Sequence, residues 1–158
     1  MVPAHIKDTS LNKAYAHHYL ETLVQEKLDA VNAELASTLE ARNADTKSSA
    51  GDKHEVARAM VQQELDQLEE QRSKWIALQQ ELTRVPLDRV FDKVAFGSLV
   101  TTDQGNYFIA IGLGAISVNG ETGYAISLAS PIGQAMNGKA PGEAFIFQGR
   151  RITVRSVQ

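Results

Sequence analysis

Cysteine is absent from this chain of 158 residues, and aromatic side chains make up only 6% of it. Without cysteine the chain can form no disulfide framework, no thiolate nucleophile and no cysteine-based zinc site. No stretch approaches the roughly 20 apolar residues that a membrane-spanning helix requires, and the first residues show no apolar run typical of a signal peptide. We therefore expect a soluble cytoplasmic protein that does not bind membranes.

Clustered positive charge is also lacking. The first 82 residues carry a net charge of −5 and the rest a net charge of +2, which together give the −3 of the whole chain. Proteins that bind DNA or RNA need groups of Lys and Arg to displace counterions from phosphates. Here the basic residues are interspersed with acids, so we expect no direct sequence-specific binding of nucleic acid.

The first half of the chain contains apolar residues at helical spacing. Asp8, Thr9 and Ser10 are good N-cap residues, so we expect a helix to begin near Leu11 and to end near Asn43. Within it, apolar residues recur in steps of three and four, the spacing of one helix face. These residues are Leu20, Val24, Leu28, Val31, Leu35 and Leu39.

A second periodic run follows a stretch of small polar residues, 44–51, that favours a turn. This run ends before Pro86, which cannot continue a helix. Two of its positions, Arg72 and Gln79, are polar, which weakens the seam but helps to fix its register. Trp75 lies on the same seam, and we expect it to pack between the helices and the second half of the chain. The seam consists of Val61, Leu65, Leu68, Arg72, Trp75, Gln79 and Leu82.

Two such helices joined by a short loop predict an antiparallel coiled-coil hairpin over residues 1–82, with its tip at about 43–54. The alternative is a larger helical bundle. The sequence favours the hairpin, because the second half of the chain offers no further long helix to complete a bundle. Residues 83–93, which include Pro86, are predicted to form a linker.

Short apolar runs separated by turn residues predict a β-rich domain over residues 94–158. Pro131, preceded by Ser130 as N-cap, predicts a short helix through Asn137 that stops at Gly138. A tight hairpin is expected at Gly149–Arg150. The fold class is therefore α+β, with one short helix beside the strands. The candidate strands cover residues 96–102, 107–113, 115–118, 124–127, 144–148 and 151–157.

Three segments together resemble the Gre family of transcription elongation factors. Residues 94–100, VAFGSLV, resemble the opening strand of the family's C-terminal domain. Residues 125–143, AISLASPIGQAMNGKAPGE, are similar to the family signature ISxxSPIGxALxGKxxGD almost position by position. Residues 51–58, GDKHEVAR, resemble the acidic start of the family's second helix. With the hairpin, the resemblance spans nearly the whole chain.

The resemblance implies a partner and a way of acting. It implies an FKBP-like fold for residues 94–158, without prolyl isomerase activity, that docks on bacterial RNA polymerase at the rim of the secondary channel. It further implies that the coiled coil enters the channel, so that the protein is an accessory factor and not an enzyme, with no cofactor of its own. We expect a monomer. The residues expected to contact the polymerase are Ser130, Pro131, Ile132, Gly133, Gln134 and Lys139.

At the tip of the hairpin the resemblance implies acids that assist transcript cleavage by the polymerase. Asp52 would be the main acid, sharing Mg²⁺ with the polymerase, and Glu55 and Asp45 would help. Paired cations stabilise the attacking and leaving oxygens of such a reaction, and Mg²⁺ prefers carboxylate oxygens. The chain departs from the family pattern at Ser49, which stands where the first of two acids is expected.

Three interpretations of the tip and of the whole protein therefore stay open. Asp52 and Glu55 could assist cleavage, or they could simply stabilise a helix N-terminus as acids do there. In the second case the protein would occupy the polymerase channel without stimulating cleavage. A third possibility, from another class, is a coiled-coil adaptor with no polymerase contact.

Other motifs carry less weight. The segment from Gly133 to Lys139 matches G-x-x-x-x-G-K, but Ala140 stands where a phosphate-binding loop needs Ser or Thr. His17 and His18 are adjacent and on a helix would point about 100° apart, so a shared metal site is not expected. Ser130 has no Ser-His-Asp context and is interpreted as a helix cap.

Overall fold

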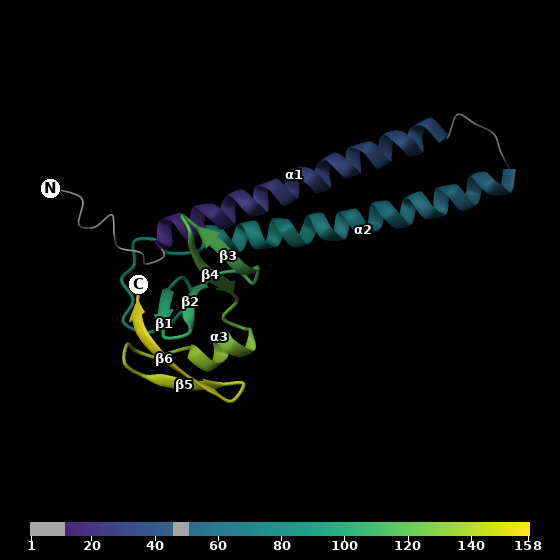
Figure 1. Ribbon diagram of the computed structural model, residues 1–158. Helices are drawn as coiled ribbons and strands as arrows, with labels where there is room; N and C mark the ends of the chain where they lie inside the picture. The colour runs from purple at the N-terminus through teal and green to yellow at the C-terminus, as the bar shows by residue number, and fades with distance from the viewer. Residues whose placement is uncertain (1–11, 46–50) are drawn as a thin grey trace. The chain divides into compact units, whose positions relative to one another are not determined.

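The computed structural model describes residues 12–45 and 51–158. Two long helices, α1 (Lys13–Asp45) and α2 (Gly51–Thr83), precede a β-rich region with one short helix, α3 (Pro131–Met136). This hairpin with a mixed sheet and a short helix confirms the predicted α+β class (Figure 1). The strands are β1 (Leu99–Thr102), β2 (Gly105–Ile109), β3 (Gly114–Val118), β4 (Glu121–Ile126), β5 (Ala144–Phe147) and β6 (Arg150–Val157).

Contacts between residues divide the chain into two compact units. Thr22–Gln80 form the hairpin unit, and the residues up to Glu21 together with Glu81–Gln158 form the β-rich unit. The first turns of α1 and the last residues of α2 therefore group with the strands. The sequence had placed all of residues 1–82 in the hairpin, and had treated residues 83–93 as a separate linker.

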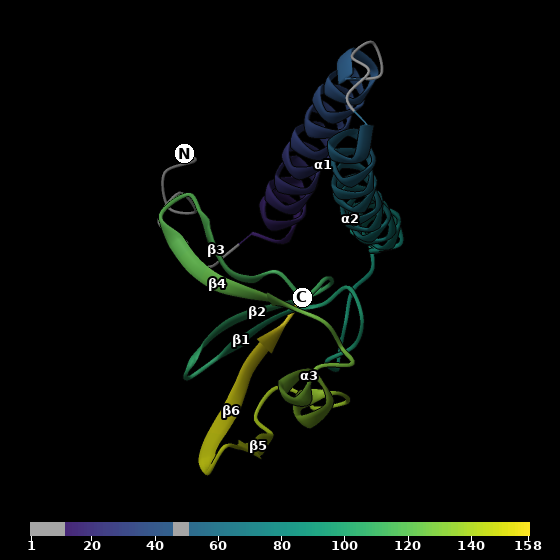
Figure 2. The same cartoon turned by 90° about the vertical axis from the view of Figure 1, so that its right-hand side faces the viewer.

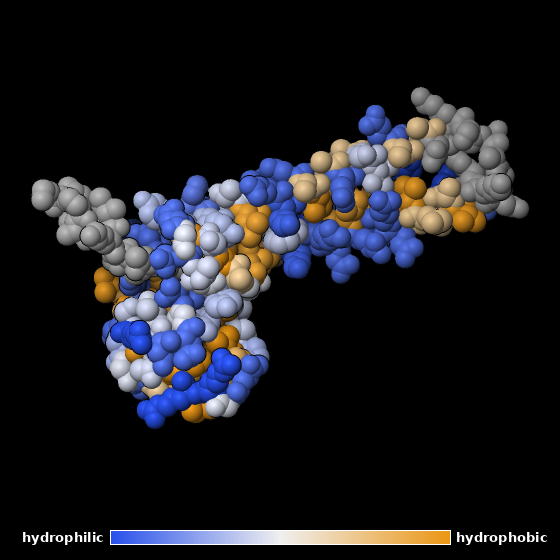
Figure 3. Space-filling view, in the orientation of Figure 1, coloured by the Kyte–Doolittle hydropathy of each residue, from blue (hydrophilic) through white to orange (hydrophobic). Residues whose placement is uncertain are grey.

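In the hairpin unit α1 and α2 run antiparallel (Figure 1). Apolar residues gather where the two helices meet, while the outer sides are hydrophilic (Figure 3). Leu39, at the end of the predicted seam, is 38% exposed, so burial ends before the periodicity does. One buried cluster consists of Val31, Leu35, Leu65 and Leu68, with Val61 and Trp75 packed against it, and Val24 and Leu28 of α1 are buried as well.

Both polar residues in the seam of α2 bond to α1. Arg72 Nε donates a hydrogen bond to Asn32 Oδ1 at 3.0 Å, and Gln79 Nε2 donates one to Gln25 Oε1 at 2.9 Å. A shift of one helix along the other would break both bonds, because each needs one particular pair of facing positions. The two bonds thus supply a physical basis for the predicted role of these residues in setting register.

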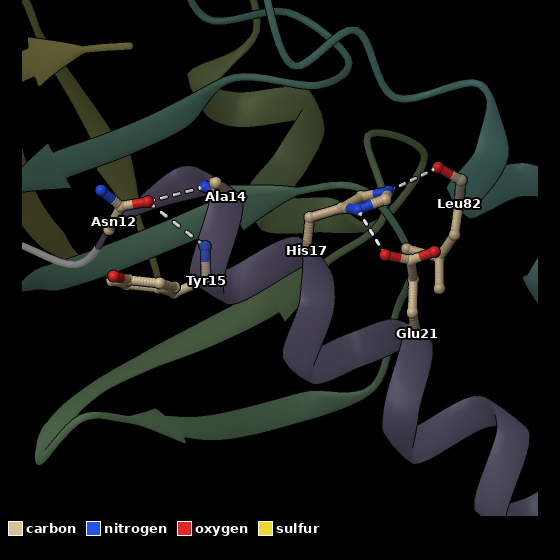
Figure 4. A network of polar contacts seen from close by, with 6 residues as sticks. All are labelled: Asn12, Ala14, Tyr15, His17, Glu21 and Leu82. Carbon is tan, nitrogen blue, oxygen red and sulfur yellow. Dashed lines mark hydrogen bonds and ion pairs between the residues drawn. The ribbon is translucent and has the colours of Figure 1, made fainter.

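Helix α1 begins at Lys13, two residues after the predicted start near Leu11, and its cap is Asn12. The Asn12 Oδ1 atom accepts hydrogen bonds from the backbone N–H groups of Ala14 (2.9 Å) and Tyr15 (3.2 Å), as Figure 4 shows. These are two of the donors that the first turn of any helix leaves without a partner. Asp8, Thr9 and Ser10, the predicted caps, lie outside the described residues.

His17 links the start of α1 to the end of α2 within the β-rich unit. Its Nε2 atom lies 2.8 Å from the backbone oxygen of Leu82, and its Nδ1 atom lies 3.0 Å from Glu21 Oε1 (Figure 4). The ring is buried, as is Leu82. A carbonyl oxygen can only accept, so the Nε2 atom carries the hydrogen of that bond. His17 therefore has a structural role, which accounts for it without a metal.

The segment predicted as a linker, residues 83–93, contributes buried side chains to the β-rich unit. Val85 and Phe91 are both buried. Lys13 Nζ lies 4.7 Å from the centre of the Phe91 ring and donates a hydrogen bond to the backbone oxygen of Arg89 at 3.4 Å. Burial lowers the pKa of Lys13 below its ordinary value of 10.5, while the nearby Asp88 carboxylate acts in the opposite direction. These contacts anchor the segment on its own unit.

The six strands form one sheet in the order β3-β4-β2-β1-β6-β5. All neighbouring pairs are antiparallel except β2 and β4, which are parallel. Helix α3 packs against β5, and Figures 1 and 2 both draw it on one side of the sheet, beside β5 and β6. One core cluster of this unit consists of Val94, Val100, Tyr107, Ile109, Met136, Phe145, Ile152 and Val154, and Phe108, Leu99 and Ile111 are fully buried as well.

Two hairpin turns use residues with positive φ. Asn119 and Gly120 (φ 53° and 82°) join β3 to β4, and Asn-Gly is the preferred pair for such a turn. Gln148 and Gly149 (φ 51° and 75°) join β5 to β6. The sequence had placed this second turn one residue later, at Gly149–Arg150. It was displaced because glutamine gives no local signal for the left-handed conformation that Gln148 adopts.

The second predicted strand, 107–113, is shorter than expected at its C-terminal end. Strand β2 stops at Ile109, and the Ala110 N–H then donates to the Ile126 backbone oxygen at 3.0 Å. Residues 110 and 111 are nonetheless fully buried, as are Phe108 and Ile109 at the end of β2. Apolar character therefore continues past the strand because the chain stays inside the core after leaving the sheet.

Candidate functional site

The segment Ser130–Gln134, predicted to contact a partner, forms the start of α3. Ser130 Oγ accepts a hydrogen bond from the Gly133 N–H at 3.1 Å and donates one to the Ser127 backbone oxygen at 2.6 Å. Ser130 is thus the N-cap, as predicted, and Pro131 occupies the first helical turn with its side chain exposed. Gln134 Nε2 donates to the Ala129 backbone oxygen at 2.9 Å. Most polar groups of this segment are therefore engaged in shaping it.

Gly133 is required by packing. A Cβ atom built on it would lie 2.3 Å from the Ser127 backbone oxygen and 2.9 Å from that of Leu128. Backbone atoms cannot give way as the end of a flexible side chain can, so any larger residue would force α3 away from the preceding loop. The glycine of the signature is thus explained by the fold, without reference to a partner.

Lys139 follows α3, where backbone hydrogen bonds join the chain to Val94 at the start of the β-rich domain. Its backbone oxygen accepts a hydrogen bond from the Val94 N–H at 2.9 Å, and the Gly138 N–H donates to the Val94 oxygen at 2.8 Å. Gly138 has a φ of 79°, the conformation that ends many helices. The loop that resembles G-x-x-x-x-G-K is therefore a helix with its C-terminal stop.

A cavity of about 640 Å³ opens beside this segment, inside the β-rich unit. It lies within the size range of small-molecule and cofactor sites, roughly 300–1,000 Å³. Ile132 of α3 is the one predicted partner-binding residue that lines it. The other lining residues come from strands and turns of the sheet and from the hairpin turn after β5: Gln104, Tyr107, Tyr124, Ile126, Phe147, Gln148, Arg150 and Ile152.

Two tyrosines form an aromatic wall of the cavity. Tyr107 of β2 and Tyr124 of β4 are paired across neighbouring parallel strands. Their ring centres lie 5.6 Å apart at an interplanar angle of 24°, which is a stacked arrangement. Tyr107 is buried, and Tyr124 is 45% exposed. Burial raises the pKa of Tyr107 above its ordinary value of 10.0, and Tyr124 raises it further, so Tyr107 is uncharged at neutral pH.

The mouth of the cavity is polar. It carries the exposed side chains of Gln104, Gln148 and Arg150. Arg150 supplies the only formal charge among the residues that line the cavity, and none of these residues is an acid. Apolar walls with a few polar groups at the mouth are the usual composition of a binding site.

Sequence reasoning missed every cavity residue except Ile132. The missing information was the strand order, since Tyr107 and Tyr124 are neighbours only because β2 pairs with β4. Arg150 was assigned to the turn at Gly149–Arg150 and not to a strand, because Gln148 gives no local signal that the turn begins before Gly149.

The predicted tip residues lie at the ends of the two long helices. Asp45 is the last residue of α1, and Asp52 is the second residue of α2. Their side chains, like Ser49, lie outside the described residues. Glu55 is exposed on the first turns of α2. Asp52 and Glu55 thus stand near a helix N-terminus, where negative charge is favourable.

The described ranges, 12–45 and 51–158, hold no group of three or more metal-ligating side chains that could bind an ion. Within the same ranges, no helix is long and apolar enough to cross a membrane.

No protein-family model and no curated protein matches the chain. Among solved structures, it is similar to the GreA factor homolog 1 protein of Thermus thermophilus, with 15% identity and a TM-score of 0.34 over 87% of this chain and 94% of that one. It is also similar to the factor of that name from Thermus aquaticus, with 16% identity and a TM-score of 0.32 over 84% and 94%. Values this low do not place the chain in a family.

Proposed function

We propose that this protein binds bacterial RNA polymerase, inserts its helical hairpin into the secondary channel, and stimulates cleavage of backtracked RNA. The proposal rests first on the resemblance of residues 125–143 to the Gre signature. The observation that supports it further is the form of the hairpin, two long antiparallel helices with Asp45 and Asp52 at the ends that the connecting segment joins. In this proposal the chemistry belongs to the polymerase, and the protein is an accessory factor.

The hairpin is long, and its two helices are held in one register. From Gly51 to Gln80, α2 contributes 30 residues to the hairpin unit, which at about 1.5 Å per residue is roughly 45 Å. Its apolar seam and two interhelical hydrogen bonds hold the helices in one register. An arm held in one register can bring residues at its tip to a defined depth in a channel.

Asp52 is the residue we propose to assist cleavage, with Glu55 and Asp45 as helpers. Carboxylate oxygens are the donors that Mg²⁺ prefers, and a Mg²⁺ shared with the polymerase would stabilise charge on the oxygens of the scissile phosphate. Glu55 lies three residues from Asp52, so the two share one side of the helix.

A second candidate mechanism is occupation of the channel without cleavage. It is favoured by Ser49, because a serine cannot supply the negative charge of the first acid in the family pattern. The same binding mode would then slow elongation and suppress the intrinsic cleavage of the polymerase.

The Ser130–Gln134 segment and Lys139 are proposed to dock on the polymerase. Pro131 and Gln134 are exposed, and Lys139 is partly exposed. An adaptor that never meets the polymerase is the alternative from another class. Co-purification with core RNA polymerase separates the two, and Pro131→Ala combined with Lys139→Ala is expected to weaken it. Loss of binding in a variant that retains its fold supports this docking surface.

The deciding experiment is a transcript-cleavage assay on stalled, backtracked elongation complexes with Mg²⁺. The wild-type protein is expected to shorten the RNA from its 3′ end and to allow elongation to resume. Asp52→Asn is expected to lower the cleavage rate by at least tenfold without weakening binding. Glu64→Gln, an equal change of charge at an exposed position farther along α2, serves as the control.

Each outcome of this assay has a distinct meaning. Bound protein that blocks cleavage would replace the first mechanism with channel occupation. Equal activity of Asp52→Asn and wild type would remove Asp52 from the mechanism. No binding and no effect on the RNA would favour the adaptor.

A further inference from the structure

The cavity between the sheet and the start of α3 has features of a site for a particular kind of ligand. Its walls are apolar and aromatic, and its mouth carries one arginine and two glutamines. None of these residues except Ile132 belongs to the segment proposed to contact the polymerase. The cavity therefore calls for its own explanation.

Arg150 is directed to the cavity by the alternation of strand β6. Side chains on a strand alternate between faces, and Ile152 and Val154 of β6 are buried in the core. Arg150 is two residues before Ile152 and so shares its face. Arg151 lies on the opposite face, where its partner in β5 is Ile146, which is 64% exposed.

The Arg150 guanidinium is available for a ligand. The ion pairs of residues 12–45 and 51–158 do not include it, and the cavity walls contain no acid. A guanidinium presents two parallel N–H groups that match the two oxygens of a carboxylate. A phosphate would bring about two negative charges against this single cation, so the charge balance favours one carboxylate.

The aromatic wall supplies the second half of the recognition. Tyr107 stacks on Tyr124, and Tyr124 remains 45% exposed beside the cavity. Ile126, Ile132 and Phe147 extend this wall as an apolar surface. An apolar or aromatic group placed there would be removed from water, and an aromatic one could also stack on Tyr124.

The backbone at the mouth of the cavity is unusual at Gln148. It has a φ of 51°, which is uncommon for residues other than glycine, asparagine and aspartate. A glycine or asparagine would form this turn more readily. Strained positions of this kind gather at ligand sites, and Gln148 lines the cavity together with Arg150.

We propose that this cavity binds a ligand that joins an apolar or aromatic group to a single carboxylate. The carboxylate pairs with Arg150, the apolar group lies against Tyr124 and Ile126, and Gln104 and Gln148 bond to neighbouring amide groups of the ligand. This chemistry occurs in small aromatic acids and in the C-terminal residue of a polypeptide.

The test uses two probes that differ in one group. N-acetyl-phenylalanine carries the carboxylate, and N-acetyl-phenylalaninamide replaces it with a neutral amide. Each is titrated into the full-length, isotope-labelled protein, and the amide and side-chain NMR signals of the β-rich unit are followed. The acid is expected to give saturable shifts at Gln104, Tyr124 and Ile152, and to bind at least tenfold more tightly than the amide.

Matched variants assign the preference to individual residues. Arg150→Gln is expected to bind both probes equally and weakly, whereas Arg151→Gln, with the same loss of charge on the other face of β6, retains the preference. Tyr124→Ala is expected to weaken both probes to a similar extent. Arg150, Arg151 and Tyr124 are exposed enough for these variants to fold, and their unliganded spectra check this directly.

The source of the ligand follows from a second pair of probes. A Gly-Gly-Gly-Phe peptide with a free C-terminus that binds more tightly than the acetylated amino acid indicates a polypeptide end. Equal or weaker binding indicates a small acid. The proposal is overturned if neither acid gives saturable shifts, if acid and amide bind equally, or if Arg150→Gln keeps the preference of the wild type. None of these outcomes depends on the polymerase.

Discussion

The hairpin unit and the β-rich unit bury their apolar side chains in different ways. In the hairpin, buried residues such as Val31, Leu35, Leu65 and Leu68 form a seam between two helices. In the β-rich unit, one cluster alone brings together buried residues from four strands, α3 and the loop at Val94. The seam between two helices is a single row of contacts, so its polar pairs help to fix the register of one helix against the other. The core of the β-rich unit is specified instead by how closely its side chains fit together. Substitutions should therefore affect the two units differently.

The largest effect is expected from the core of the β-rich unit. Phe108→Ala removes a fully buried aromatic ring and should lower the free energy of unfolding of this unit by about 3–5 kcal/mol. This change in the free energy of unfolding is measured from the urea dependence of amide hydrogen exchange in the sheet. Ile146→Ala, on an exposed side chain of the same sheet, is the control and should cost less than about 0.5 kcal/mol. Similar costs for both would show that the core is not closely packed.

A smaller effect is expected in the hairpin. Leu65→Ala removes one of the buried seam residues and should cost about 2–3 kcal/mol, near the low end for such changes, because a thin seam can close around the gap. Trp75 is the only tryptophan and packs against this cluster, so its fluorescence reports on the change. Met60→Ala is the control, at a position 66% exposed on the same helix. It should leave the midpoint of the unfolding transition, followed by fluorescence, unchanged.

The polar pairs of the hairpin should contribute less than its apolar residues. A double-mutant cycle of Arg72→Ala and Asn32→Ala is expected to give a coupling energy of about 0.5–1 kcal/mol. The cycle is measured by urea unfolding. The control cycle combines Arg72→Ala with Gln25→Ala. Because Gln25 bonds to Gln79, this cycle should give almost no coupling energy. Coupling of the same size in both cycles would mean that the bonds act through the whole hairpin.

The smallest effect is expected at the turn beside the cavity, and it has the opposite sign. Gln148→Gly relieves the positive φ and should stabilise the β-rich unit by about 0.5 kcal/mol, after the added entropy of the unfolded chain is subtracted. Gln104→Gly, in a turn where no positive φ is needed, should destabilise it slightly. If Gln148→Gly also weakens binding of the acid probe, the glutamine at this turn favours ligand binding while it lowers the stability of the β-rich unit.

Much of the hairpin could be predicted from the sequence, because its contacts repeat a local period. The spacing of Leu28, Val31 and Leu35 was enough to indicate the buried face of α1, and Pro86 indicated that α2 would stop. The polar positions Arg72 and Gln79 could be recognised as interruptions. Their partners Asn32 and Gln25 could not be named, since this requires knowing how far one helix is displaced along the other.

The candidate site could be predicted only in part. Ser130 and Pro131 gave the start of α3 correctly, because capping depends on a few neighbouring residues. The cavity could not be predicted, since its walls come from β2, β4, β6 and α3, and since the parallel pairing of β2 with β4 joins segments that are separated in the chain by β3. The tip acids Asp45, Asp52 and Glu55 remain a prediction from resemblance.

The sequence by itself determined the elements of this protein: two long helices, a capped short helix, and a set of strands with their turns. Each depends on spacings of a few residues, and local backbone geometry decides them. The tertiary structure alone decided which side chains meet. It placed Tyr124 beside Tyr107, Arg150 at the mouth of the cavity, and His17 against Leu82. These contacts link residues far apart in the chain, and only the packing of the whole unit fixes them.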